Sequence, residues 1–282
     1  MQELDEYINK VKHLPPAPRI LPQLLHLLNQ PDTDSGQVVD LISLDPSLTA
    51  GVLQLCNSAF FASATAASDI QEAITRLGFR QVFQLVASIS GARALSPPQK
   101  GYGIDAGELW QHSVTAAVAA QIMAQELGED DSVIFTATLL HDIGKLVLAE
   151  ALEHIYAKVI EEIETHQYSL LETEKKLLGV QHAEIGGRLL SRWNFPENMV
   201  TAVWHHHHPA QAQDHRRLAS FVYLGNMIAY FMGHGYGHQA FALRGRTEAI
   251  DFLALKADDL PKYMIRTFDK MEIIKALFRI SK

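Results

Sequence analysis

The sequence predicts an all-α protein built as two helical lobes. Apolar residues recur at helical spacing in most segments, helix start and stop signals separate them, and clear strand alternation is missing. At 282 residues, with 48% hydrophobic and 20% charged residues, the chain is long enough for two domains of ordinary size. This composition can bury a substantial core and gives no indication of disorder.

The first predicted lobe covers residues 1–98. The prolines between residues 14 and 18 predict an extended loop, because each proline disfavours helix in the residue before it. Ser35 is the predicted cap of one helix, and Asp45 followed by Pro46 predicts the start of the next. The apolar residues with helical spacing in this lobe are Leu24, Leu25, Leu27, Leu28, Val38, Val39, Leu41, Ile42, Leu48, Val52, Leu55, Val82, Leu85 and Ile89.

Two further signals divide the chain. Asp69 with Glu72 resembles a capping box, and Gly78 is the predicted end of the helix that they begin. Ser96-Pro97-Pro98, followed closely by two glycines, is the strongest break in the sequence. We therefore place the predicted domain boundary between residues 98 and 99.

The second predicted lobe, residues 99–282, is also helical. Asp105 is the predicted start of a long helix that ends near Gly128. Further helices are expected over residues 134–140 and 151–166, after a capping box at Ser169 and Glu172, around His182, before Pro209 and over 218–232. A glycine-rich loop over 232–238 and two C-terminal helices are expected to complete the lobe.

Composition argues against several classes of function. A net charge of −8 without clustered Lys and Arg disfavours binding to nucleic acid. The single cysteine, Cys56, excludes an intramolecular disulfide and a cluster of thiolate metal ligands. The acidic N-terminus is unlike a secretory signal, and the apolar stretches are too short to span a bilayer. We therefore expect a cytoplasmic protein with no membrane contact.

The segment with the clearest chemistry is Leu139-Leu140-His141-Asp142-Ile143-Gly144-Lys145. An imidazole nitrogen and a carboxylate oxygen side by side can hold one divalent ion, such as Mn, Fe, Ni or Zn. A helix or tight turn would bring Lys145 to the same side, where it could contact a phosphate. The alternative is a hydrogen-bonded pair at a helix end without a metal.

This segment resembles the signature of the HD superfamily of metal-dependent phosphohydrolases, and the rest of the lobe supports the resemblance. His112 opens a long Ala/Val-rich helix, His182 begins a helix with glycines, and His206-His207-His208-Pro209 matches a paired-histidine helix end. The resemblance implies a metal site and no organic cofactor, with Asp142 and Lys145 in catalytic roles. The implied metal ligands are His112, His141, Asp142, His182, His206, His207 and Asn226.

Asn226 departs from the superfamily pattern, which has an aspartate at this place. An amide oxygen is a weaker, neutral ligand, so the site loses one negative charge that would hold a divalent ion. Asn226 is therefore either a weak ligand or a hydrogen-bonding remnant of one. The other histidines are expected at the surface, among them His205, His208 and His234.

The first lobe points to one family within this superfamily. Its motifs are Leu14-Pro15-Pro16-Ala17-Pro18, Asp45-Pro46-Ser47-Leu48, Cys56-Asn57-Ser58-Ala59, Glu72-Ala73-Ile74 and Leu77-Gly78, and their order resembles the HDOD family. The resemblance covers residues 10–235. It implies a bacterial regulatory output module, similar to the HD-GYP cyclic-di-GMP phosphodiesterases but often without their catalytic ligands. No Gly-Tyr-Pro motif follows the paired histidines here, which argues against hydrolysis by that route.

Two functions remain open from the sequence. The favoured one is a non-catalytic signalling module that binds a protein partner or a nucleotide second messenger. The alternative is an active phosphohydrolase in which a metal generates hydroxide and Lys145 steadies the phosphate charge. A direct nucleic-acid binder is a third, weaker reading, because no basic stripe is present.

Overall fold

The computed structural model describes residues 2–11, 20–28, 30, 34–58, 61, 66–155, 158–159, 161–162, 165, 169–235 and 248–279. Across these ranges the secondary structure is helical, and the extended pairing is limited to an isolated bridge between Gln99 and Ile104. The prediction of an all-α fold is confirmed. The predicted loop over residues 14–18 lies outside the described ranges.

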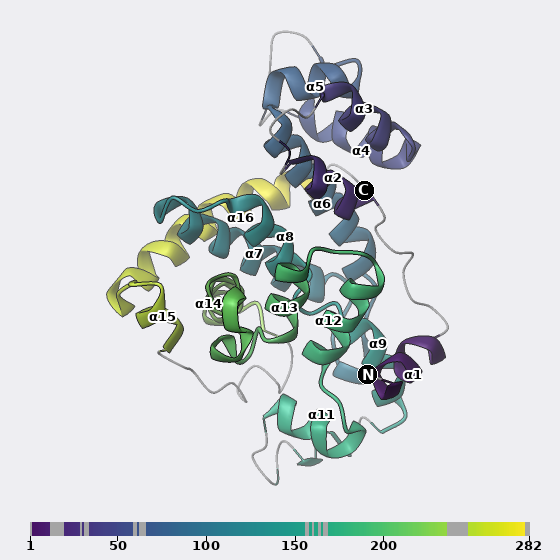
Figure 1. Cartoon of the computed structure of the whole chain (residues 1–282), viewed down its shortest axis with the longest axis vertical. Helices are drawn as coiled ribbons and strands as arrows, with labels where there is room; N and C mark the ends of the chain where they lie inside the picture. Colours follow the sequence, from purple (N-terminus) through teal and green to yellow (C-terminus); the bar gives the residue numbers. More distant parts are fainter. Residues whose placement is uncertain are drawn as a thin grey trace.

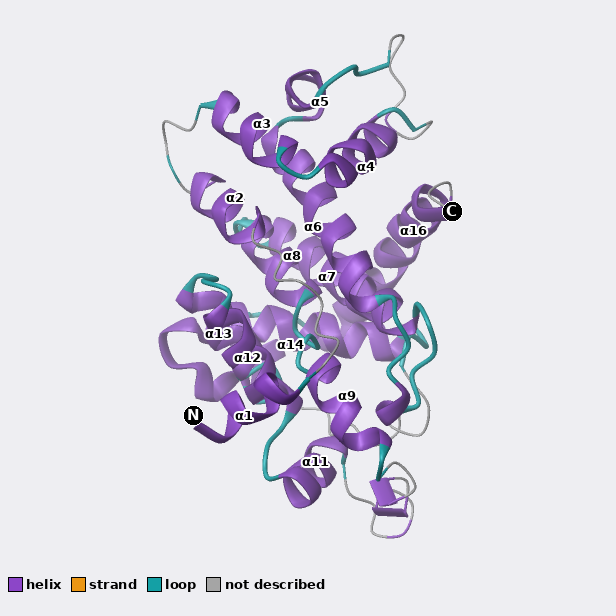
Figure 2. Ribbon diagram, turned by 90° about the vertical axis from the view of Figure 1, so that its right-hand side faces the viewer, coloured by secondary structure: helices purple, strands orange, loops and turns teal. Residues whose placement is uncertain are grey.

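The helices α2–α5 gather at one end of the molecule (Figure 1). They are α2 (Ile20–Leu28), α3 (Ser35–Ser43), α4 (Pro46–Cys56) and α5 (Ile70–Leu77). The long helix α6 (Phe79–Leu95) runs from this end into the rest of the structure (Figure 2). One face of α6 packs against α4 and α5, and another packs against α8. The core of this lobe is thereby continuous with the core of the second.

Local capping explains where these helices begin. Asp45 accepts a hydrogen bond from the Leu48 amide at 2.9 Å, with Pro46 in the first helical position, as predicted. The predicted cap at Ser35 is wrong by one residue. Asp34 caps α3 instead, because its carboxylate accepts from the Gly36 amide at 3.0 Å and leaves Ser35 as the first helical residue.

The predicted stop and start signals around α5 agree with the structure. Asp69 accepts from the Glu72 amide at 2.8 Å, and Glu72 in turn accepts from the amide of Ser68, one residue before the cap. Gly78 ends α5 with a φ of 79°, in the left-handed region that favours glycine.

The first helix, α1 (Gln2–Lys10), packs against the second lobe rather than against α2–α5. Asp5 forms an ion pair with Arg188 at 2.7 Å, and the Tyr7 hydroxyl donates to the Leu178 carbonyl at 2.9 Å. Figure 1 shows the N-terminus beside α12. The boundary at residues 98/99 stays a prediction. Although α1 belongs to the first predicted lobe by its sequence position, it packs against helices of the second.

The second lobe is organised around α7 (Glu108–Glu126), a helix buried almost throughout. It packs against α8 (Asp131–Leu139), α14 (Arg216–Phe231) and α16 (Leu260–Arg279). The remaining elements are α9 (Lys145–Glu153), α11 (Leu170–Leu178), α12 (His182–Arg192), α13 (Glu197–Trp204), α15 (Glu248–Phe252) and the short turns η2 (Lys100–Tyr102), η3 (Pro209–His215) and η5 (Ala257–Asp259). The capping box at Ser169 and Glu172 is confirmed at the start of α11.

Two helix boundaries in this lobe differ from the sequence prediction. The long helix begins at Glu108 rather than Asp105, because Gly107 takes a φ of 86° and the Glu108 carboxylate folds back onto the Asp105 amide. The helix expected over 151–166 is divided: α9 begins at Lys145 and ends at Glu153, and the described residues 158, 159, 161, 162 and 165 are helical again, as expected. Helix α9 starts directly after the His-Asp turn, where its apolar residues pack inward.

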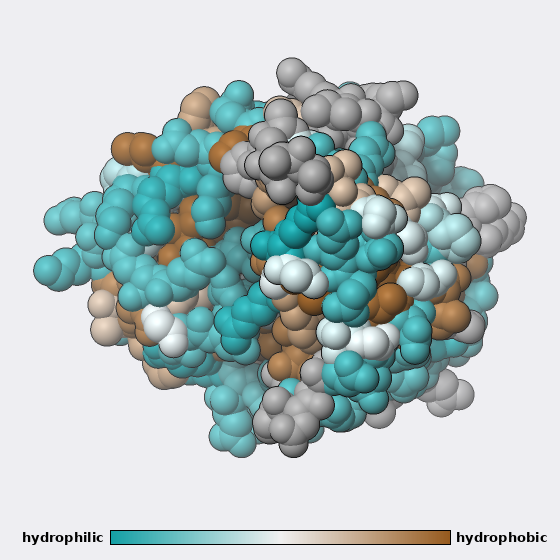
Figure 3. Space-filling view, turned by 90° about the horizontal axis from the view of Figure 1, so that it is seen from above, coloured by the Kyte–Doolittle hydropathy of each residue, from teal (hydrophilic) through white to brown (hydrophobic). Residues whose placement is uncertain are grey.

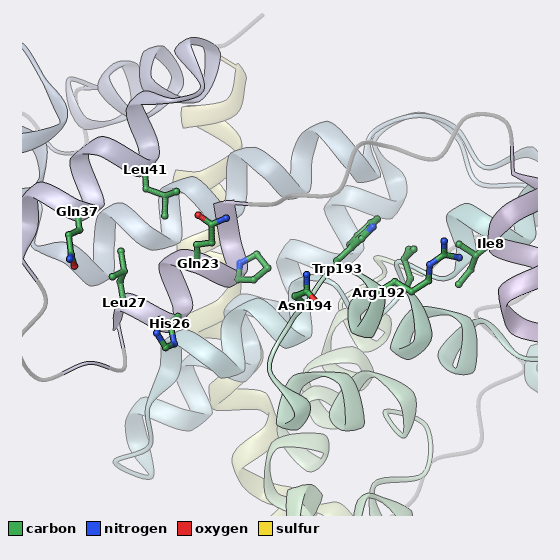
Figure 4. Close-up of a pocket in the computed structure, with 11 residues that line it drawn as sticks. Ile8, Gln23, His26, Leu27, Gln37, Leu41, Arg192, Trp193 and Asn194 are labelled. Atoms are coloured by element: carbon green, nitrogen blue, oxygen red, sulfur yellow. The ribbon is translucent and has the colours of Figure 1, made fainter. Parts of the chain in front are cut away.

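No single helix in the described ranges is long and apolar enough to cross a bilayer. The pair α3 and α4 together has the necessary length and apolar composition, but a bend of 117° separates the two helices. Viewed from the end that carries α3–α5, the surface is largely hydrophilic, with apolar residues visible in recesses (Figure 3). A cleft of about 950 Å³ separates α2 and α3 from the end of α12 (Figure 4). His26, Gln37 and Trp193 line it.

Gly144 is required by a close approach between the His-Asp turn and α12. A Cβ atom there would lie 1.9 Å from the His182 carbonyl oxygen and 2.7 Å from the Gly186 nitrogen. The substitution Gly144→Ala should therefore destabilise the fold by about 3 kcal/mol, because two backbones must separate. Gly36→Ala, in α3, meets only the Asp34 side chain and serves as the control. Equal melting temperatures for the two variants would contradict this packing.

Candidate metal centre

The His-Asp pair lies on a buried turn between α8 and α9. Residues 141–144 form the turn, and Lys145 is the first residue of α9. His141, Asp142 and Lys145 are each at most 1% exposed. Charged groups removed from water in this way need compensating partners. The Lys145 ammonium lies 2.7 Å from Oδ2 of Asp142 and provides one of them.

The Asp142 carboxylate is the point at which His141 of the same turn meets histidines from three further elements. Its Oδ2 lies 3.4 Å from Nε2 of His141 and 3.7 Å from Nε2 of His112 on α7. Its Oδ1 lies 3.2 Å from Nε2 of His182 on α12 and 3.8 Å from Nε2 of His206, just after α13. One carboxylate therefore faces two groups of imidazoles, one through each oxygen.

The backbone holds three of these imidazoles in one tautomer. Nδ1 of His141 lies 2.6 Å from the Thr138 carbonyl oxygen, and Nδ1 of His206 lies 2.7 Å from the Val203 carbonyl oxygen. Nδ1 of His112 lies 2.7 Å from the carbonyl oxygen of residue 234. A carbonyl oxygen only accepts hydrogen bonds, so each Nδ1 carries a proton, and the neutral rings of His112 and His206 are left with an unprotonated Nε2 on the side of Asp142.

His182 is oriented by a side chain instead. Glu174 of α11 is 1% exposed, and its carboxylate lies 2.8 Å from Nδ1 of His182 and accepts from the His182 amide at 2.8 Å. The Tyr102 hydroxyl donates to the same carboxylate at 2.7 Å. Carboxylate–histidine pairs of this kind fix the ring and raise the basicity of the nitrogen that faces a metal. Glu174 is therefore a supporting residue for the site.

His207 completes the second group. Its Nε2 lies 2.9 Å from Nε2 of His182, and its ring centroid lies 3.9 Å from that of His206. Two neutral Nε2 atoms that both present lone pairs would repel each other at this distance. A shared proton or a cation between them removes the conflict.

Asn226 lies beside His112 rather than apart from the site. Its side-chain amide lies 3.0 Å from Nε2 of His112 and is 2% exposed, and the NH₂ group of the amide is the part that can donate to an unprotonated Nε2. The contact depends on close packing of α14 and α7, because a Cβ on Gly225 would lie 2.5 Å from the Ala116 carbonyl oxygen. Asn226 therefore lies next to His112, and its role as the last ligand, which the resemblance to the HD superfamily implies, stays a prediction.

Burial sets the protonation of the histidines. Burial lowers the pKa of His112 to about 3, and burial together with neighbouring histidines holds the pKa values of His206 and His207 well below 6.5. Burial acts in the same direction on His182, but the Glu174 carboxylate outweighs it and raises the pKa of His182. Three of these rings are thus neutral near pH 7 and available as ligands.

The pKa of Asp142 is shifted in the opposite sense to the one that burial alone would give. Desolvation would raise it, but His141 and the Lys145 ammonium hold the pKa of Asp142 well below its ordinary value. The carboxylate is therefore ionised. Burial and Glu174 raise the pKa of Tyr102 well above its usual range, so its hydroxyl remains a hydrogen-bond donor.

The residues present fit a divalent metal. Within the described ranges, two sets could hold an ion: His112 with His141 and Asp142, and His182 with His206 and His207. Nε2 of His141 and Nε2 of His206 are buried and have no hydrogen-bond partner in the structure. Imidazole nitrogens with one carboxylate form the donor set expected for a transition metal or zinc. A bound ion would act there as a Lewis acid.

The structure brings together all the residues that the sequence nominated: His112, His141, Asp142, Lys145, His182, His206, His207 and Asn226. Their roles as ligands or catalysts stay predictions. Lys145 lies against Asp142 rather than projecting to a surface. Three groups that support the histidines were not predicted from the sequence: Glu174, Tyr102 and the backbone carbonyl of His234, a residue expected at the surface. None of the three has a local sequence signal, because each contact joins distant segments.

Comparison with known proteins identifies the family of this chain. The HDOD domain model matches residues 14–209. An uncharacterised protein of Treponema pallidum is 27% identical over 227 residues, which is 79% of this chain and 44% of that protein. A ribonuclease Y of Thermus thermophilus is 35% identical over 103 residues, which is 36% of this chain and 13% of that enzyme. The chain thus spans less than half the length of these relatives.

Solved structures share the fold. A proposed signal transduction protein of Marinobacter aquaeolei has a TM-score of 0.77 at 24% identity, covering all of this chain and 65% of that one. A proposed phosphohydrolase of Shewanella amazonensis has a TM-score of 0.70 at 24% identity, covering 95% and 93%. An HDOD domain protein of unknown function from Geobacter sulfurreducens has a TM-score of 0.67 at 22% identity, covering 94% and 87%.

The helical fold and the buried histidine–aspartate cluster define a protein of the HD type. Within that class, the match over residues 14–209 and the α2–α6 lobe place the chain in the HDOD family, to which it belongs.

The buried neutral histidines predict an acid-labile metal-free protein. Below pH 6.5 these histidines become protonated in the unfolded chain, whereas His112, His206 and His207 stay neutral in the folded protein. Their stabilising contribution is therefore complete above pH 6.5 and is lost as pH falls, at about 1.4 kcal/mol per pH unit for each ring. The raised pKa of His182 acts in the opposite sense. Urea denaturation at pH 7 and pH 5 measures the slope. A free energy of unfolding that is equal at both values would contradict the neutral assignment.

Proposed function

We propose that this chain is a regulatory output module of a bacterial signalling pathway, with a divalent metal at the Asp142 centre as a structural or sensing element. It would act in the cytoplasm through a signalling protein or a nucleotide second messenger, and not on nucleic acid. Family membership and the intact cluster support a role in the HD superfamily. One observation favours regulation over catalysis, namely the low negative charge of the cluster.

The charge argument rests on the groups that face the cluster. Among the described residues, the two potential ligand sets contain one carboxylate, Asp142. Asn226 contributes a neutral amide next to His112. Two divalent ions would bring four positive charges to imidazoles and this single carboxylate. The next carboxylate, Glu174, contacts Nδ1 of His182 and belongs to neither ligand set. Such a centre holds one ion far better than two, and a phosphohydrolase that relies on paired ions would be compromised.

Lys145 reduces the available charge further. Its ammonium is 1% exposed and lies 2.7 Å from Oδ2 of Asp142, the oxygen that also faces His112 and His141. An incoming cation near His112 and His141 therefore competes with a fixed positive charge. The Oδ1 side, which faces His182 and His206, is the more favourable place for a single ion. Mn, Fe, Ni and Zn all suit the donor set.

Catalysis remains the second candidate because the histidine set is complete. Released from Asp142, Lys145 could neutralise a phosphate, and the cluster could orient a phosphoester. Relatives named ribonuclease Y match a segment of this chain, so RNA belongs among the phosphodiesters tried. Metal-dependent turnover that disappears in Asp142→Asn would favour this candidate over the regulatory one.

Changing one residue should restore the missing charge. Asn226→Asp adds a carboxylate at His112, and we expect it to tighten the binding of Mn²⁺ or Zn²⁺ at least tenfold and to raise the number of bound ions from one toward two. Asp142→Asn, nearly identical in volume, should abolish stoichiometric binding. Elemental analysis and calorimetric titration of the three proteins measure both effects.

The same three proteins test the charge argument itself. If the wild-type protein binds two ions as tightly as Asn226→Asp does, the charge argument for a regulatory role is wrong. If none of the three binds a metal at pH 7.5, the centre is not a metal site.

A further inference from the structure

A second cavity lies away from the Asp142 centre, where the two lobes meet the C-terminal helix. It encloses about 660 Å³ and is bordered by α6, by α7 and α8, and by α16. This volume lies within the range of small-molecule sites in proteins, which often form where lobes meet. Its apolar lining consists of Phe61, Leu77, Leu85, Val118, Phe135, Ile273 and Ile274.

Most charges around this cavity already have partners. Asp131, 7% exposed, accepts from Gln121 at 3.0 Å and from Gln125 at 2.6 Å. Arg80 lies 3.6 Å from Asp131 and 3.4 Å from Asp130. These carboxylates are thus satisfied by amides and a guanidinium, and they have little capacity left for a cationic ligand.

Lys270 is the exception. It is half-buried on α16 beside the buried Met271, it lines the cavity, and it has neither an ion pair nor a hydrogen bond with any residue in the described ranges. Burial lowers its pKa, Arg266 adds to that effect, and Asp131 opposes it without reaching ion-pair distance. An ammonium that has lost part of its hydration without gaining a partner favours an anion.

Two half-buried amides also line the cavity. Gln81 and Gln84, on α6, line the cavity and form no hydrogen bond with any described residue. They can donate to or accept from the middle of a ligand, while the phenyl rings of Phe61 and Phe135 provide apolar contact area. Among the described residues, the lining therefore offers one cation without an ion-pair partner, two amides without hydrogen-bond partners, and apolar side chains.

We propose that this cavity binds a small organic anion with a flat apolar body, its anionic group at Lys270 and its body against the apolar lining. Such a ligand would contact α6 of the first lobe, α7 and α8 of the second, and α16 at once, and would hold these elements in one arrangement. The larger cleft in Figure 4 lacks an equivalent cation, since Arg192 there already bonds to Asn9 at 2.9 Å. This proposal requires no metal, so it stands or fails separately from the proposed function.

The test uses the full chain and the fluorescent aryl sulfonate 8-anilinonaphthalene-1-sulfonate. We expect one dye per chain, with at least tenfold weaker binding to Lys270→Met, which keeps the length of the side chain and removes its charge. Lys262→Met is the matched control, because Lys262 is on the same helix but exposed and paired with Glu126 at 2.6 Å. Binding to this control should be unchanged.

A cavity-filling variant and an uncharged dye make the test decisive. Gln84→Trp should block binding, and N-phenyl-1-naphthylamine, which has the same body without the sulfonate, should bind at least tenfold more weakly than the sulfonate. Thermal melts establish that each variant is folded. Equal dye affinity in Lys270→Met and Lys262→Met, several dyes per chain, or equal binding of the neutral dye would overturn the proposal.

Discussion

The contact between Asp142 and the imidazoles around it is the constraint on which the second lobe depends. A carboxylate that is 1% exposed would be costly to bury without partners. Lys145 provides a charge at 2.7 Å, and the turn, α7, α12 and the end of α13 each bring an Nε2 atom within 3.8 Å. Each helix must therefore be correctly placed for this one group to be satisfied, so the cluster couples the elements of the lobe to one another.

Much of the fold could be predicted from the sequence because helix boundaries are local. The cap at Asp45, the stop at Gly78 and the capping box at Ser169 each depend on residues within one turn. The errors arose where a neighbour competes for the same role. Asp34 caps α3 in place of Ser35, since its carboxylate reaches the Gly36 amide.

In the candidate site, too, the residues with local sequence signals could be predicted and the long-range contacts could not. Short sequence motifs predicted every residue that faces Asp142, because each histidine is part of a motif that can be recognised from its neighbours in the sequence. The supporting contacts come from distant segments: Tyr102 reaches Glu174 across 72 residues, and His112 reaches the carbonyl of residue 234 across 122. No spacing rule predicts such pairs. The packing of η2 and α12 against α9, and of α7 against α14, brings these segments together.

We infer that His112 and His206 present unprotonated Nε2 atoms to the Asp142 centre, where a cation can bind. The most direct measurement is ¹⁵N NMR of the histidine side chains, recorded on the metal-free protein and during a Zn²⁺ titration. We expect His112, His141 and His206 to carry a proton on Nδ1 before zinc is added. We also expect Nε2 signals of the cluster to shift at stoichiometric zinc while the Nδ1 protons persist. Protons on Nε2 of His112 and His206, or spectra unchanged by zinc, would contradict this inference.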